Sequence, residues 1–129
     1  MVLVTRLLVF ALFPLQFVQL PIRVHDDLDL PFGTMKVSFD RGSGGHKGLE
    51  SVIKAVRTKK FTRVRIGISP RAAAGTVRKP QGDKAVTDFI LKKYSSRELD
   101  ELKKVFKKAA QAVETAIAAG PATAMNQSN

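Results

Sequence analysis

The sequence predicts one α/β domain, in which strands and helices alternate along the chain around a single hydrophobic core. A chain of 129 residues is long enough for one such core and too short for two ordinary domains. Apolar residues make up 44% and charged residues 26%, which is a globular composition rather than a disordered one. Segments with strand-like and helix-like spacing follow one another from residue 17 to residue 120, as expected for a layered α/β domain.

Residues 1–16 are an atypical apolar segment. One basic residue, Arg6, precedes an apolar run over 7–15 that has the length of a signal-peptide core and falls short of the roughly 20 residues that span a bilayer. No small-x-small cleavage signature follows, and Pro14 would break a helix through the run. A signal or membrane anchor within residues 1–24 is therefore a weak alternative, and we interpret residues 17–25 as a buried strand leading into Asp26.

Two further strands and one helix are expected in the middle of the chain. Residues 34–39 alternate loosely and predict a strand, after which a glycine-rich loop leads into a helix beginning at Gly48. Residues 61–69, FTRVRIGIS, predict a clear strand. Residues 69–84 predict a basic, mobile loop rich in glycine and proline, and residues 85–94 predict an ordered piece of undetermined type.

The last helix carries the clearest sequence signals. Ser95 and Glu98 form a capping box, and Gly120 followed by Pro121 predicts the helix end. Residues 17–120 would therefore form the domain, and residues 121–129 a flexible tail. The predicted buried stripe of this helix consists of Leu99, Leu102, Phe106, Ala109, Val113 and Ile117.

Charge is the strongest global feature of the chain, with 22 Lys and Arg residues against 11 Asp and Glu. Residues 36–84 contain thirteen basic and only three acidic residues. A balance of this size favours a polyanionic partner, with nucleic acid ahead of an anionic membrane surface. The chain has no cysteine, which excludes disulfides, cysteine nucleophiles and cysteine-based metal sites.

Two short stretches could carry chemistry. Asp26, Asp27 and Asp29 follow a predicted strand, where they could bind a divalent metal, orient a histidine, or cap a solvated turn. The stretch GSGGHKG, residues 42–48, opens a helix, and glycines at a helix N-terminus let an anionic ligand approach the backbone. Its histidine, His46, could contact substrate, transfer protons or serve structure alone.

Four motifs in order, HDDLDLPFG, GSGGHKGLESVI, FTRVRIGI and GDKAVTDFIL, together resemble the bacterial-type peptidyl-tRNA hydrolase family over about residues 24–118. The resemblance implies a single α/β domain with a twisted mixed sheet flanked by helices. It also implies hydrolysis of the ester between a peptide and the terminal ribose of tRNA, with tRNA as partner and no metal or other cofactor. A monomer that is cytoplasmic or mitochondrial, with no stable membrane association, is the corresponding expectation.

The resemblance also assigns residues. Asp26 matches the family's catalytic aspartate, which orients a histidine base, and His46 matches a residue of the substrate channel. Gly44, Gly45 and Lys47 belong to the same substrate-binding loop, although Lys47 stands where the family usually has asparagine. Arg65 matches a basic residue placed for tRNA phosphates, and charge alone adds the remaining tRNA-binding candidates Arg63, Lys103 and Lys107.

The sequence departs from the family in one essential respect. The family motifs G-N-P-G, R-H-N and Y-M-N, which include the catalytic histidine, do not occur in it. We therefore expect a domain that is incomplete at its N-terminus, corresponding to the C-terminal two-thirds of the family fold, with weak or no activity. His25 is expected to be a poor substitute base, because adjacent strand residues point to opposite faces. The alternative function is a non-catalytic tRNA- or RNA-binding module.

Overall fold

The computed structural model describes residues 21–72 and 76–129. Within them, a three-stranded mixed sheet has the strand order β1-β3-β2, where β1 is Ile22–Pro31, β2 is Met35–Phe39 and β3 is Thr62–Ser69. Strand β3 pairs in parallel with β1 and antiparallel with β2. The predicted α/β domain with a mixed sheet is confirmed, as are the strands predicted over 34–39 and 61–69.

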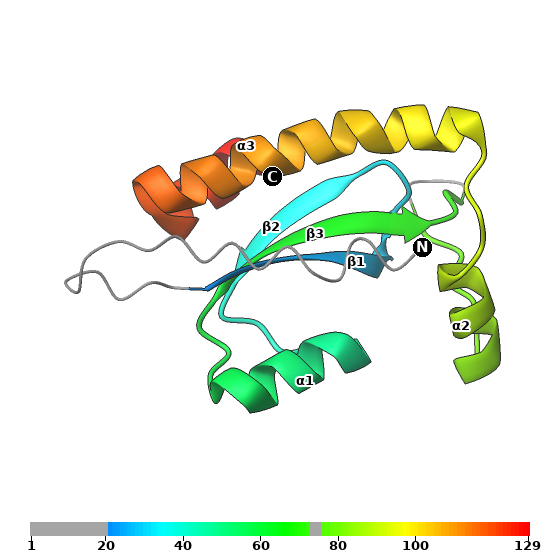
Figure 1. The fold of residues 1–129 in the computed structure, drawn as a ribbon, viewed down its shortest axis with the longest axis horizontal. Coiled ribbons are helices and arrows are strands. Elements are labelled where there is room, and N and C mark those ends of the chain that lie inside the picture. The colour runs from blue at the N-terminus through cyan, green and yellow to red at the C-terminus, as the bar shows by residue number, and fades with distance from the viewer. Residues whose placement is uncertain (1–20, 73–75) are drawn as a thin grey trace.

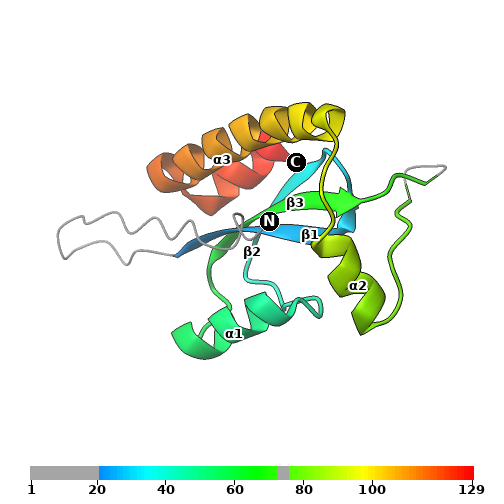
Figure 2. The same cartoon turned by 45° about the vertical axis from the view of Figure 1, so that its right-hand side comes forward.

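In the described part of the chain, three helices flank the sheet (Figure 1). The long helix α3, Ser96–Ser128, covers one face, whereas α1, Lys47–Val56, lies on the opposite side. The short helix α2, Asp83–Ile90, lies near the end of the sheet where β1 and β3 finish (Figure 2). This helix is the ordered piece that the sequence left untyped.

The core lies between the sheet and α3. Val37, Val64 and Ile66 of the strands pack against buried α3 residues, and each of the three is 2% exposed or less. Strand β3 is buried along almost its whole length because it is the central strand. This position explains why Thr62 and Arg63, which interrupt the apolar pattern, are nevertheless buried.

The predicted buried stripe of α3 is partly wrong. Leu99, Phe106 and Ile117 are 38%, 38% and 55% exposed. The helix instead turns its small residues to the sheet, because alanines allow a close approach of helix to sheet. The buried positions of α3 are Leu102, Val105, Ala109, Ala112, Ala116 and Ala124.

The C-terminal segment also differs from its prediction as a flexible tail. The helix breaks at Gly120, where φ is 87°, but the chain from Pro121 to Ser128 is helical again. Ala124 is fully buried, and the side-chain amide of Asn129 is hydrogen-bonded to both backbone groups of Val37. These contacts hold the segment against the free edge of β2.

Strand β1 runs further than predicted. It begins at Ile22 and continues past Asp26 to Pro31, with an irregularity in its pairing between Asp27 and Pro31. In the opposing strand, a Cβ at Gly67 would lie 2.0 Å from the carbonyl oxygen of Pro31, so only glycine fits there. The predictions for residues 1–16 and 17–20 lie outside the described residues. In the described part of the chain, no helix is both long enough and apolar enough to cross a membrane.

Candidate active site

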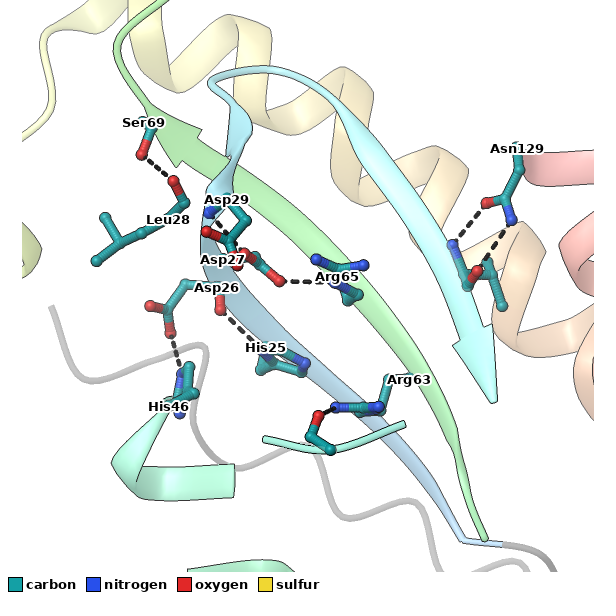
Figure 3. Close-up of polar contacts among 12 residues, drawn as sticks. His25, Asp26, Asp27, Leu28, Asp29, His46, Arg63, Arg65, Ser69 and Asn129 are labelled. Carbon is teal, nitrogen blue, oxygen red and sulfur yellow. Dashed lines mark hydrogen bonds and ion pairs between the residues drawn. The ribbon is translucent and has the colours of Figure 1, made fainter. Parts of the chain in front are cut away.

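Asp26 lies where the regular pairing of β1 with β3 is about to end, and its carboxylate is 27% exposed. Its Oδ1 atom is 3.5 Å from Nε2 of His46, which comes from the loop before α1 (Figure 3). The structure therefore brings together the two residues that the sequence assigned to catalysis and to the substrate channel. Their roles themselves stay predictions.

His46 is also the N-cap of α1. Its Nδ1 atom accepts a hydrogen bond from the backbone N–H of Leu49, at 3.1 Å. A neutral imidazole that accepts at Nδ1 carries its proton on Nε2, so the ring donates toward Asp26. The hydrogen bond to Asp26 raises the pKa of His46 above its ordinary value, and the same bond lowers the pKa of Asp26.

His25 lies beside this pair. Its Nδ1 atom is 2.7 Å from the backbone oxygen of Asp26, and because a carbonyl only accepts, Nδ1 carries the proton. The ring meets that of His46 edge to face, with centroids 5.0 Å apart. Burial lowers the pKa of His25, so this ring is neutral at pH 7. It contacts the Asp26 backbone and not its carboxylate, in agreement with the expectation from strand geometry.

The other two carboxylates of the cluster have separate partners. Asp27 accepts from Nε of Arg65 at 2.6 Å and from the backbone N–H of Asp29 at 2.7 Å. Asp29 forms an ion pair with Lys79. Among residues 21–72 and 76–129, no group of three or more His, Asp or Glu side chains is placed to hold a metal ion. The three aspartates thus serve three different contacts.

An open groove of about 1140 Å³ runs past this site. One wall is the loop before α1, in which Gly44 and Gly45 have φ values of 61° and 82° that favour glycine. Lys47 lines the same wall, with its Nζ atom 3.4 Å from Asp83 of α2 and most of its side chain in solvent. All the predicted substrate-binding residues therefore line one groove together with Asp26.

The predicted tRNA-binding residues are not gathered in one place. Arg65 lines the groove but is engaged with Asp27, and Arg63 is only 3% exposed, with Nη1 donating to the carbonyl of Gly42. Lys103 and Lys107 belong to α3, on the other side of the sheet from α1 (Figure 1).

The groove contains three further cations that the sequence analysis did not assign individually, Lys36, Arg41 and Lys79. Lys36 pairs in register with Arg65 on the neighbouring strand, a relation that becomes visible only once the strand pairing is known.

The family model described as Peptidyl-tRNA hydrolase matches residues 7–129. The peptidyl-tRNA hydrolase of Mycobacterium ulcerans is 41% identical over 104 residues, which are 81% of this chain and 50% of that protein. The peptidyl-tRNA hydrolase of Arthrobacter sp. (strain FB24) is 37% identical over 106 residues, or 82% of this chain and 50% of that protein.

Solved structures give the same result for the fold. A crystal structure of peptidyl-tRNA hydrolase from Acinetobacter baumannii superimposes with a TM-score of 0.67 and 27% identity, covering 84% of this chain and 50% of that one. A complex of peptidyl-tRNA hydrolase with N-propanol gives a TM-score of 0.68 with 28% identity and the same coverage. The chain spans about half the length of the curated relatives that it matches.

Proposed function

The chain belongs to the peptidyl-tRNA hydrolase family, and on that premise we propose that it binds peptidyl-tRNA and acts on the ester between the peptide and the terminal ribose. The observation that carries the proposal is the Asp26–His46 pair, with an Oδ1–Nε2 distance of 3.5 Å, in the wall of a groove that contains Lys36, Lys47 and Lys79. The cations favour an RNA end, and the Asp26–His46 pair in the same groove supports placing the ester beside it.

In ester hydrolysis, a water attacks the carbonyl carbon, a base takes its proton, and donors hold the oxyanion that forms. The first turn of α1 offers such donors, because the N–H groups of Lys47 and Gly48 precede the first intrahelical hydrogen bond, from Glu50 to His46. Gly44 and Gly45 leave room for a substrate to approach them.

Proton removal is the step that these residues support least. His46 uses Nδ1 to accept from Leu49 and directs Nε2–H toward Asp26, so its neutral ring has no free lone pair. His25 has a free lone pair on Nε2, but that atom is buried and has no partner among the described residues. Because a positioned base contributes about 10²–10⁴-fold, we expect slow turnover.

The test is a paired measurement of binding and hydrolysis with the purified chain and N-acetyl-aminoacyl-tRNA. We expect salt-sensitive binding that weakens in Lys36→Ala, which alters an exposed groove lysine. The matched control is Lys93→Ala, which removes an exposed lysine outside the groove and should bind as the unmodified chain does. Turnover is expected to lie about 10²–10⁴-fold below that of the Mycobacterium ulcerans relative.

Two results would count against this proposal. Absence of binding at moderate salt would remove the function altogether. Turnover equal to that of the relative, and abolished by Asp26→Asn, would show that His46 or His25 serves as a full base, and the argument from the occupied nitrogens would be wrong.

A further inference from the structure

All the buried side-chain polar atoms that lack a hydrogen-bond partner in the described part of the chain belong to one side of the sheet. They are Nε of Arg23, Nε2 of His25, Oγ of Ser38, and both Nε and Nη2 of Arg63. Alternate residues of a strand share a face, and Val64 and Ile66 point to α3, so Arg63 points away from α3. These unpaired atoms therefore gather on the face opposite the hydrophobic core.

Strand register makes three of these residues neighbours. Arg23 of β1 pairs with Arg63 of β3, and Ser38 of β2 pairs with Arg63 from the other side. Arg23 and Ser38 thus lie on either side of Arg63, and the three side chains form one row across the sheet. The row presents unpaired N–H donors of two guanidinium groups and the unpaired O–H donor of one hydroxyl group.

Among the described residues, Arg63 has no ion pair, and its charge contacts only the face of the Phe61 ring, whose centroid lies 5.8 Å from Cζ. Arg63 is 3% exposed, and its single hydrogen bond, from Nη1 to the carbonyl of Gly42 at 2.7 Å, brings no negative charge. Burial lowers the pKa of Arg63, and the charges of Arg65 and Arg41 lower it further, whereas the charge of Asp27 opposes them. The carboxylate of Asp27 is itself held by Arg65. A buried, unpaired cation is strongly unfavourable, and ordered water would satisfy its donors but not its charge.

We propose that the row of Arg23, Arg63 and Ser38 binds a small tetrahedral oxyanion of the phosphate or sulfate class. Several oxygen atoms let the Arg63 fork and the Ser38 hydroxyl each have an acceptor of their own. Ser38 and Gly42 line the groove, which gives a small ion a route to Arg63. A phosphate within a nucleic-acid backbone is too bulky to reach a guanidinium this deeply buried. The site is therefore separate from RNA binding and does not depend on the proposed hydrolase function.

The first test measures binding of radiolabelled inorganic phosphate to the intact chain by equilibrium dialysis, at an ionic strength held constant with sodium chloride. We expect one phosphate per chain, together with a thermal midpoint that rises with the logarithm of phosphate or sulfate concentration. The Ser38→Ala variant should bind about tenfold more weakly, because it loses one hydrogen bond to a charged group. The Arg63→Met variant should lose the phosphate dependence entirely.

The matched control is Arg97→Met, which removes an exposed arginine from α3 and should bind phosphate like the unmodified chain. Ser38→Ala keeps the test decisive if Arg63→Met does not fold. Addition of deacylated tRNA at the same ionic strength should leave the bound phosphate in place. No bound phosphate in the unmodified chain, equal binding in Ser38→Ala, or displacement of the phosphate by tRNA would each overturn the proposal.

Discussion

The Asp26–His46 pair is expected to stabilise the fold most at mildly acidic pH. His46 has a raised folded-state pKa, so its contribution is fully present below its ordinary value of 6.5 and is lost as pH rises through the folded value. Asp26 has a lowered pKa, so its contribution is present above its ordinary value of 3.8 and is lost as pH falls through the folded value. Between these limits, both partners are charged in the folded protein.

The strength of the pair follows from its geometry. At the observed 3.5 Å, Coulomb's law gives about 1.2 kcal/mol with the dielectric constant of water and about 4.7 kcal/mol with an effective value near 20. Both side chains are roughly a quarter exposed, so desolvation and screening remove part of this. Protonating Nδ1 also ends its bond from the Leu49 N–H, which costs about 1 kcal/mol as the loss of a helix cap. The expected net coupling is about 1 kcal/mol.

A double-mutant cycle of Asp26→Asn and His46→Asn measures this coupling by urea unfolding at pH 5.5 and pH 8.0. Asparagine at position 46 is a good N-cap, so the cycle removes the imidazole while keeping the start of α1. We expect about 1 kcal/mol at pH 5.5 and about half of that at pH 8.0, where only a neutral donor faces Asp26. Because Asp26 and His46 both affect the pKa of His25, the cycle is repeated in a His25→Asn background, which removes that titration. Equal coupling at both pH values, or none at pH 5.5, would refute the proposed ion pair.

Three further substitutions test the packing. Gly67→Ala should lower the free energy of unfolding by more than about 3 kcal/mol or prevent folding, because its Cβ would overlap the Pro31 carbonyl; circular dichroism of the purified variant would show this. Leu102→Ala should lower the free energy of unfolding in urea by about 2–4 kcal/mol, and Leu99→Ala, at a more exposed position, by less than about 1 kcal/mol. Equal losses would support the stripe predicted from the sequence, in which both leucines are buried. Asn129→Ala should cost about 1–2 kcal/mol through loss of its two bonds to Val37, and an unchanged denaturation midpoint would show that the C-terminal segment contributes nothing.

Most helices and strands could be predicted from the sequence, because caps and hydrophobic spacing depend on interactions between residues close together in the chain. The capping box at Ser95 and Glu98 is present in the structure, with both of its reciprocal hydrogen bonds. The prediction chose the wrong buried face of α3. It followed the stripe that contains leucine and phenylalanine, whereas the close approach of the helix to the sheet requires the face that contains alanine. That choice depends on the distance between helix and sheet, which no local pattern contains.

In the candidate site as well, local patterns predicted the residues but not the contacts between them. Motifs identified Asp26 and His46, but their contact depends on where the loop before α1 returns to β1. Charge alone could not separate Arg65, which lines the groove, from Arg63, which is buried two residues away. The difference arises from pairing: Arg63 has Ser38 and Arg23 as neighbours in the sheet, whereas Arg65 has Lys36 and His25 and reaches Asp27.

Both ring nitrogens of His46 are occupied, but we expect the resulting loss of hydrolase activity to be partial. In a carboxylate–histidine pair that works as a base, the carboxylate holds one ring nitrogen and the other nitrogen takes the proton. Asp26 already holds Nε2, so His46 needs only to exchange the Leu49 N–H at Nδ1 for a water. Losing that cap costs about 1 kcal/mol, which reduces the competent population about fivefold. The rest of the expected deficit of about 10²–10⁴-fold follows because Nδ1 caps the helix and is not positioned as a base toward the ester. The chain should therefore behave as a slow hydrolase whose remaining turnover still depends on Asp26.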